Sequence, residues 1–291
     1  PPRLGRIPAG RRGPMDFDFQ HIAVPFRMQP GLRRMPPGAS HLTPLQAGSA
    51  LHTEKRAVLG AAQMPIALAD FDPALALGSL EQAARQTPGV ALPPSPLDVR
   101  ELALAVQEDF AILDSQGRVP WMCVCVPSHW APEDKLGLSL TAIHAPVADN
   151  AALQAAAPAL LALATGGQAW ERFVWTLTPS ARHDQHPRRH ARSPWPVEAD
   201  PQDAQAFARQ CFLRVERQTF LPVRGPDGAS AHQAVFTIRV MLQALSEAVA
   251  TPVQARRLHD ALASMSDAAA QYKNLAAARG PVLRWLSQRM A

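Results

Sequence analysis

The order in which strand-like and helix-like segments follow one another constrains the fold of this chain more than any other feature of its sequence. Two strand patterns, 110–113 and 119–126, flank the turn-forming residues 114–117, and this arrangement predicts a hairpin. Helical patterns come next, and three further strand patterns follow at 169–177, 211–221 and 233–242. Five strands that are interrupted by helices after the second strand predict an α+β protein with an antiparallel sheet.

Helices are expected at both ends of this sheet. Ser79 and Gln82 form a capping box, and Ser95 followed by Pro96 predicts the start of a second helix before the first strand. Residues 246–291 are predicted to be helical, with a break at Gly280 and Pro281. A five-stranded antiparallel sheet with inserted helices resembles the layout of a PAS domain, here with helical N- and C-terminal additions.

Charge and composition argue against two classes of protein. The 29 Lys and Arg against 24 Asp and Glu give a net charge of +5, but the arginines are scattered, which indicates a solvated surface and no nucleic-acid partner. No run approaches the roughly 18–20 apolar residues of a membrane span, so no membrane helix is expected. Three cysteines give no even disulfide framework, which favours a reducing, cytoplasmic location.

The start of the chain differs in composition from the rest. Residues 1–14 are rich in Pro, Arg and Gly and lack the apolar stretch of a secretory signal. We expect residues 1–23 to be a disordered or upstream segment and residues 24–291 to form a single ligand-binding domain. Its core is expected at about 108–243 and its C-terminal helices at about 246–291.

A short helix between Pro132 and Pro146 is predicted to point His144 toward the protein interior. His144 shares one helical face with three apolar residues, Leu136, Leu140 and Ile143. A neutral imidazole on an apolar face is what an axial haem ligand requires. The same position suits a core histidine or one that caps the helix C-terminus, so the residue alone leaves these interpretations open.

The strand pattern 211–221 carries charged residues on both faces. Alternation puts Arg214, Glu216 and Gln218 on one face, and Leu213, Val215, Arg217 and Thr219 on the other. Such a strand is either a sheet edge or the wall of a polar pocket. On the next strand pattern, Arg239 shares a face with Thr237 and Met241. In an apolar cavity, an arginine would polarise bound oxygen and a glutamate would bind a protonated amine.

Other candidate residues give weaker signals. His183, His186 and His190 have a spacing that can capture a divalent metal, but they lie in the segment 179–201, whose proline and arginine content predicts an exposed loop. Cys123 and Cys125 share a strand face and are expected to pack as small apolar residues, with a thiolate haem ligand as an open alternative. Glu108 and Asp109 directly precede the first strand pattern and are either cavity residues or solvated ones.

Six segments in order carry a resemblance to a known family. They are Val106-Gln-Glu-Asp-Phe110, Pro127-Ser-His-Trp130, Lys135-Leu-Gly137, Ile143-His-Ala-Pro-Val147, Leu213-Arg-Val-Glu-Arg-Gln-Thr219 and Val235-Phe-Thr-Ile-Arg239, with Pro25-Phe-Arg-Met28 before them. Together they resemble the haem-dependent oxidative N-demethylase alpha-subunit family. The resemblance extends from about residue 24 to near the C-terminus.

The resemblance implies a PAS-like fold that binds haem b and uses dioxygen to remove a methyl group, as formaldehyde, from a small secondary amine such as dimethylamine. Electrons would come from NADPH through partner subunits that carry flavin and an iron–sulfur cluster. Carried over by motif, His144 would be the proximal iron ligand. Arg217 and Lys135 are the other candidate cofactor-binding residues, and the candidate catalytic residues are Glu216, Arg214 and Arg239.

Two positions depart from the family pattern. Val174 stands where members tend to have Asn, and Met241 stands where they tend to have Tyr. If the missing side chains order oxygen or substrate, amine oxidation is in doubt while haem binding survives. The alternatives are therefore a non-catalytic haem, gas or small-ligand sensor of the same fold, or a structural domain that binds a partner protein and whose cavity is occluded or empty.

Overall fold

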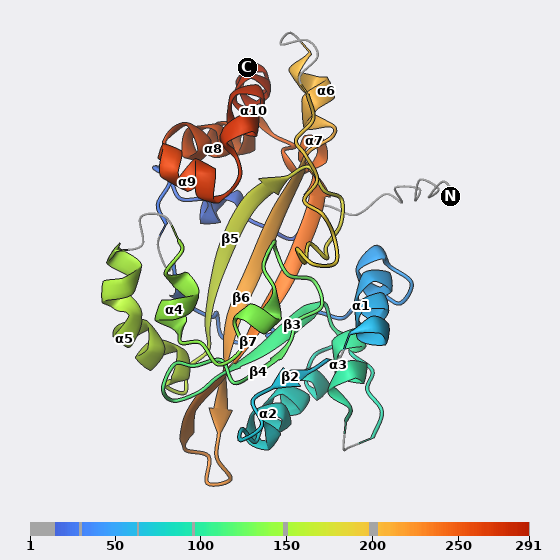
Figure 1. Cartoon of the computed structure of the whole chain (residues 1–291), viewed down its shortest axis with the longest axis vertical. Coiled ribbons are helices and arrows are strands. Elements are labelled where there is room, and N and C mark those ends of the chain that lie inside the picture. Colours follow the sequence, from blue (N-terminus) through green and yellow to red (C-terminus); the bar gives the residue numbers. More distant parts are fainter. Residues whose placement is uncertain are drawn as a thin grey trace.

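The computed structural model describes residues 15–28, 31–62, 64–94, 97–147, 151–197 and 203–290. Within these residues, one antiparallel sheet of seven strands has the order β1-β5-β6-β7-β3-β4-β2 (Figure 1). The strands are β1 (Arg33–Arg34), β2 (Ile66–Ala67), β3 (Glu108–Leu113), β4 (Trp121–Cys123), β5 (Trp170–Thr178), β6 (Phe212–Arg224) and β7 (Ser230–Ala244). The α+β class is confirmed.

The prediction of five strands is wrong, because the sheet has seven and the two additional strands lie at its edges. β3 to β7 correspond to the five predicted strands and form the centre of the sheet, while β1 and β2 pair with β5 and β4 at its two edges. Each edge strand has only two residues. A two-residue strand is too short to produce the alternation on which the prediction relied, so only pairing in the folded chain reveals it.

β6 lies inside the sheet, so the interpretation of its charges as those of an edge strand is wrong. It pairs along its length with β5 on one side and β7 on the other. In this register Glu216 lies opposite Val174 of β5 and Val240 of β7. The polar face of β6 is therefore flanked by two strands and must be covered by other elements or line a cavity.

The helices gather at the ends of the sheet and beside it (Figure 1). They are α1 (Ala50–Ala61), α2 (Ala74–Arg85), α3 (Val99–Ala105), α4 (Leu140–His144), α5 (Ala151–Thr165), α6 (Ala204–Ala208), α7 (Leu245–Ala248), α8 (Pro252–Ala263), α9 (Asp267–Tyr272) and α10 (Ala276–Gln288), with 3-10 turns η1 (Phe19–His21) and η2 (Pro132–Asp134). Among the described residues, no helix has both the length and the apolar character needed to span a membrane.

Several helix boundaries differ from the predicted ones. α2 starts at Ala74, before the expected capping box, and α3 starts after Asp98, whose side chain accepts from the Arg100 backbone; the predicted cap at 95–96 lies outside the described residues. α10 continues through Pro281 because its next turns bury Trp285 in the core. Tertiary packing outweighs the local penalty of an interior proline there.

The predicted helix between Pro132 and Pro146 is divided into two short pieces. Pro132 starts η2, and α4 begins only after Ser139, whose hydroxyl accepts from the Ala142 backbone. Gly137 separates the two pieces in the left-handed conformation, with φ of +77°, which ends any continuous helix. Leu136 therefore does not share a helix with His144, although both lie on the same short segment.

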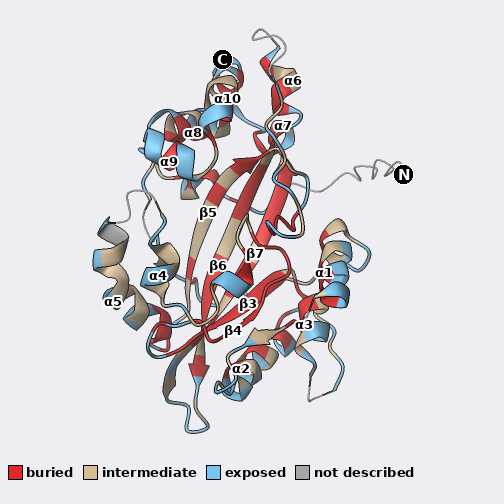
Figure 2. Ribbon diagram, in the orientation of Figure 1, coloured by how far each residue is buried: buried red, intermediate tan, exposed pale blue. Residues whose placement is uncertain are grey.

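Two large clusters of buried apolar side chains pack helices against the sheet (Figure 2). One packs α8, α9 and α10 against the strands and includes Trp285, Leu213 and Trp175, and the other packs α1 to α3 against β3 and β4 and includes Trp121. Phe17, which precedes the predicted start of the domain at residue 24, is already part of the first cluster. The predicted disorder of 1–14 concerns residues outside the described part of the chain.

The segment after β5 is not the exposed loop that its composition predicts. Residues 183–186 are all buried. Glu54 of α1 accepts hydrogen bonds from the backbone N–H groups of His183 and Asp184, at 3.2 and 2.7 Å, and lies 3.0 Å from the His183 ring. Because one carboxylate holds several donors, the polar segment is drawn inward against α1.

Candidate functional site

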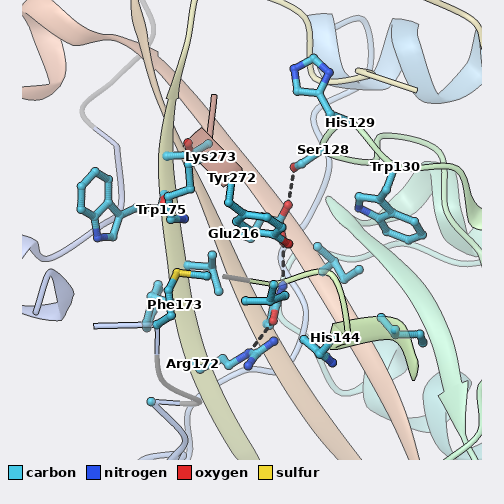
Figure 3. Close-up of a pocket in the computed structure, with 18 of the residues that line it drawn as sticks. Ser128, His129, Trp130, His144, Arg172, Phe173, Trp175, Glu216, Tyr272 and Lys273 are labelled. Carbon is cyan, nitrogen blue, oxygen red and sulfur yellow. Dashed lines mark hydrogen bonds between the residues drawn. The ribbon is translucent and has the colours of Figure 1, made fainter. Parts of the chain in front are cut away.

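A cavity of about 650 Å³ lies over the face of the sheet that presents Glu216 and extends past β5, where Phe173 and Trp175 line it from the other face. Its walls come from β5 and β6, from α4 and α5, from the N-terminal segment around Phe26, and from Tyr272 to Asn274 after α9 (Figure 3). Cofactor and small-ligand sites in proteins usually occupy about 300–1,000 Å³. The volume is therefore suited to a ligand of that size.

Aromatic side chains form much of the cavity wall. They are Phe26, Trp130, Phe173, Trp175, Trp195, Phe220, Phe236 and Tyr272. The rings of Phe26 and Trp175 meet edge to face with centroids 5.8 Å apart, which fixes the N-terminal segment against β5. An apolar ligand, or a cation that attracts ring faces, would be bound favourably by such walls.

A chain of hydrogen bonds crosses the floor of the cavity. Arg172 Nε donates to Gln218 Oε1 at 2.6 Å, and Gln218 Nε2 donates to Glu216 Oε2 at 2.7 Å. On its other side, Glu216 accepts from the Ser128 hydroxyl, which itself accepts from Arg214 Nε at 2.6 Å (Figure 3). Strand alternation puts Arg214, Glu216 and Gln218 on one face, as predicted, and this face is the cavity floor.

The charges of Arg172 and Arg214 lie on the two sides of Glu216 in this series of hydrogen bonds. Burial lowers the pKa of Arg172, and it lowers the pKa of Arg214 to about 10, while Glu216 opposes both shifts. The Arg214 guanidinium therefore stays protonated at neutral pH. The result is a carboxylate that is fixed by two hydrogen-bond donors and faces an aromatic cavity, an arrangement suited to hold a small cation.

Tyr272 and Lys273 bring a second set of polar groups to the cavity from the C-terminal part of the chain. Lys273 Nζ donates to the Trp175 carbonyl at 2.9 Å and lies 5.7 Å from the Phe26 ring centroid. Burial lowers the pKa of Lys273 to about 8, against the opposing effect of Glu216, and burial also raises the pKa of Tyr272. Sequence patterns gave no signal for these residues, because only folding brings α9 to the sheet.

His144 lines the cavity from the end of α4. Its Nδ1 lies 2.7 Å from the Leu140 carbonyl, and since a carbonyl can only accept, Nδ1 carries the proton. In the neutral ring the lone pair is then on Nε2. Burial is the main cause that lowers the pKa of His144, so the imidazole is neutral at pH 7 and has the tautomer that suits a metal ligand.

Two further imidazoles line the same cavity. His21 stacks on Phe173 with ring centroids 4.4 Å apart, and burial, followed by nearby Arg33, lowers its pKa. His129 has a left-handed backbone with φ of +57°, and its pKa falls to about 4 through burial and the charges of Arg192 and Arg214. No sequence pattern predicted a role for either imidazole, so the structure adds two candidate ligands to His144.

The pKa of His129 predicts an acid-sensitive fold. The unfolded imidazole binds a proton below pH 6.5 and the folded one only below about 4, so the free energy of unfolding should fall as the pH decreases from 6.5 to 4. Since the ring is only half buried, we expect a loss of about 1 kcal/mol and not the full linkage value. Urea unfolding at pH 7 and pH 5 measures it.

His129→Asn is the informative variant, because asparagine tolerates a left-handed backbone. Its loss of stability between pH 7 and pH 5 should be smaller than that of the parent, while His259→Asn should behave like the parent. Equal losses in all three proteins would show that other groups cause the acid sensitivity.

The structure brings four of the six predicted site residues together. His144, Lys135, Arg214 and Glu216 line the cavity. Arg217 and Arg239 lie on the other face of β6 and β7 and are not among its lining residues: Arg217 Nε donates to Glu171 at 2.8 Å, and Arg239 Nε donates to Gln107 at 2.9 Å. Alternation separated Arg217 from Glu216 on β6, but only the pairing of Arg217 with Arg239 shows that both lie on the face turned away from Glu216.

The weaker candidates lie outside the cavity. Asp109 and Glu108 are each 1% exposed; Asp109 accepts from the backbones of Cys125 and Val126 and lies 3.3 Å from Lys55 Nζ. Cys125 is a buried thiol whose pKa is raised well above its ordinary value by a hydrogen bond with Cys123 and by burial. Asp109 thereby connects β3 to the backbone that follows β4.

The three loop histidines each pair with a carboxylate. His183 pairs with Glu54, His186 with Glu133, and His190 with Asp184. Within the described residues, no group of three or more His, Cys, Asp or Glu side chains is placed to hold a metal ion. The loop histidines thus act in the structure as partners of acidic side chains.

The residues of the cavity fit a haem. A porphyrin supplies four of the ligands of its iron, so one neutral imidazole such as His144 is a sufficient protein donor. Aromatic walls suit the macrocycle, and the cationic side chains of Lys135, Arg172 and Arg192 are available for carboxylate groups.

The fold and the cavity together define an α+β protein in which one half-buried carboxylate and three imidazoles line the same cavity. The model of the haem-dependent oxidative N-demethylase, alpha subunit-like family matches residues 81–283. This range covers well over half of the chain and includes β3 to β7 and α3 to α9. The chain belongs to this family.

Proposed function

We propose that this protein is the haem-binding subunit of an oxygen-dependent oxidative N-demethylase that acts on a small secondary amine such as dimethylamine. The proposal includes haem b as the cofactor and a PAS-like character for the five central strands. Their spatial order, β4-β3-β7-β6-β5, supports the latter. The compartment we expect is the cytoplasm, because all three cysteines are buried thiols.

One observation carries this proposal: Glu216 presents a carboxylate to an aromatic cavity that also contains the neutral imidazole of His144. A small alkylammonium ion needs a negative group and apolar or aromatic walls for its methyl groups. A haem needs an imidazole and apolar walls. The same cavity satisfies both requirements.

Each residue has a defined part in this proposal. Bound haem supplies an iron at which dioxygen is reduced and an N-methyl group oxidised. His144 would hold the iron through Nε2, with the Leu140 carbonyl fixing the ring. Glu216, held by Ser128 and Gln218, would bind and orient the ammonium group, and Arg214 would keep the Ser128 hydroxyl directed at Glu216.

The overall reaction requires partner proteins. One N-methyl amine, one dioxygen, two electrons and two protons give the demethylated amine, formaldehyde and water. We propose that the electrons originate from NADPH and arrive through partner subunits that carry flavin and an iron–sulfur cluster. The name of the family, which describes an alpha subunit, supports an assembly of several subunits.

The test is formaldehyde release from dimethylamine by the haem-loaded protein with a chemical or enzymatic electron donor. We expect formaldehyde in proportion to the amine consumed. A non-catalytic haem sensor is the second candidate, and it is favoured by Val174, which lies opposite Glu216 where family members tend to have a polar side chain. Haem and amine binding without formaldehyde would support the sensor and contradict the enzyme.

Lys273 predicts a pH dependence of cation binding. Below pH 8 its ammonium group is protonated and repels a cation bound near Glu216, and above pH 8 it is neutral. The affinity for tetramethylammonium, whose charge does not titrate, should therefore increase roughly fivefold, about 1 kcal/mol, between pH 7 and pH 9. Calorimetric titration at the two pH values measures the change.

Two variants separate this effect from other titrations. Lys273→Met should bind tetramethylammonium more tightly at pH 7 and show no increase at pH 9, whereas Lys135→Met should retain the increase. The raised pKa of Tyr272 keeps its phenol neutral over this range. If the affinity of Lys273→Met still increased between pH 7 and pH 9, the titrating group would be another residue.

A further inference from the structure

A second, smaller pocket of about 230 Å³ adjoins the main cavity. Apart from Ala191, its lining residues are polar or charged: His129, Ser180, Arg182, Asp184, Gln185, Arg189, His190 and Ser193. His129 and Gln185 line both spaces, so they form the boundary between them. We refer to this smaller space as the side pocket.

Gln185 has an acceptor that the protein leaves unused. The residue is 3% exposed, and its Nε2 donates to Thr178 Oγ1 at 3.3 Å and to the Arg182 carbonyl at 3.1 Å. Its Oε1 is buried and has no hydrogen-bond partner among the described residues. A buried amide oxygen in a polar pocket normally accepts from an ordered water molecule.

The side pocket reaches the Glu216 hydrogen-bond chain through short connections. The Arg182 carbonyl that accepts from Gln185 also accepts from Arg214 Nη1, at 3.4 Å. Arg214 donates to Ser128, and Ser128 donates to Glu216. His129 follows Ser128 directly, and its left-handed backbone turns the imidazole away while the Ser128 hydroxyl points at Glu216 (Figure 3).

The wall of the side pocket is held rigidly. Asp184 accepts from Arg189 through both oxygens, each at 2.8 Å, and lies 3.1 Å from His190 Nε2. The Gln185 backbone donates to the Pro127 carbonyl at 3.1 Å, which fixes the boundary to the segment that carries Ser128. These charge-assisted and backbone hydrogen bonds fix the wall of the side pocket.

We propose that the side pocket is a water-filled passage that holds an ordered water on Gln185 Oε1 and carries protons between solvent and the Ser128–Glu216 pair. A proton that enters from solvent passes along the water molecules to the Ser128 oxygen, while the Ser128 proton moves to Glu216. Glu216 then releases this proton in the main cavity, where the overall reaction consumes two protons, and is a carboxylate again. The passage supplies protons while haem and amine occupy the main cavity. This role, unlike the passage itself, rests on the proposed function.

Ser193 offers a test at a single position, because it lines the side pocket and not the main cavity. Ser193→Phe should fill the passage and Ser193→Ala should leave it open. We expect formaldehyde release by Ser193→Phe to fall about tenfold with an unchanged KM and an unchanged Soret band, and its H2O/D2O rate ratio to rise. If Ser193→Phe released formaldehyde at the rate of the parent protein and with the same H2O/D2O rate ratio, the proposal would be overturned.

Two measurements do not depend on demethylation. A high-resolution crystal structure should show a water within hydrogen-bond distance of Gln185 Oε1, absent from Gln185→Leu, and a dry pocket would overturn the proposal. In the ferric haem protein, the enhancement of solvent-proton relaxation should be lower in Ser193→Phe than in Ser193→Ala. If both hold while no amine yields formaldehyde, the passage stands and the proposed function fails.

Discussion

Glu216→Gln is expected to weaken binding of dimethylammonium by roughly 100-fold, about 3 kcal/mol, and to reduce formaldehyde release at least as much. Glutamine has the shape of glutamate and can still accept from Ser128, but its NH2 group then faces the Gln218 amide, so the variant removes the charge and the hydrogen bond from Gln218. The magnitude follows from the half-buried position of the carboxylate, which Ser128 and Gln218 hold beside the aromatic walls of the cavity. Calorimetry with dimethylammonium measures the affinity.

Glu247→Gln is the matched control, because Glu247 is an exposed carboxylate on α7. It should bind the amine like the parent protein. Haem binding and the unfolding transition should be unchanged in both variants. If Glu216→Gln bound the amine as tightly as the parent, Glu216 would have no part in recognition of the cation.

His144→Ala is expected to lower haem affinity and to change the Soret band. Loss of a group that only hydrogen-bonds a metal ligand already costs roughly 10–100-fold in affinity, so loss of the ligand itself should cost at least as much. The reason is that His144 supplies a neutral imidazole whose tautomer the Leu140 carbonyl fixes. Haem titration followed by absorption measures both effects. In His144→Gly, added free imidazole should restore the parent spectrum.

The other two cavity imidazoles provide the comparison. His21→Ala and His129→Ala should keep the parent Soret band, and so should His259→Ala outside the cavity. An unchanged spectrum in His144→Ala together with a lost one in His129→Ala would transfer the ligand role to His129. The left-handed backbone of His129 would then be part of the metal site.

The two departures from the family pattern have different consequences in the structure. Val174 lines the cavity and lies opposite Glu216, so a polar side chain there would face the proposed substrate site. Met241 is 6% exposed and packs in the core cluster on the other side of the sheet, beside Leu213 and Val215. Only the change at 174 bears directly on the cavity.

Tyr272 is the only tyrosine of the chain, and it lines the cavity from α9. A phenol is therefore present beside Glu216 although position 241 has methionine (Figure 3). Its place could not be derived from the sequence, since α9 and β6 are far apart along the chain. Contacts between distant segments leave no local periodicity.

Local patterns predicted the elements whose residues repeat regularly. Alternation located the five central strands and assigned Arg214, Glu216 and Gln218 to one face, because successive side chains of a strand point in opposite directions. It failed for β1 and β2, which are too short to alternate, and for the helix after Pro132, where Gly137 interrupts the apolar spacing.

The sequence by itself determined the α+β class, the family, and which residues of β6 act together. Only the tertiary structure decided which face of β6 forms the cavity, because alternation separates two faces but does not say what covers them. That choice placed Arg214 and Glu216 in the cavity and turned Arg217 and Arg239 away from it. It also added His129, Tyr272 and Lys273, which reach the site through contacts that form only when the chain folds.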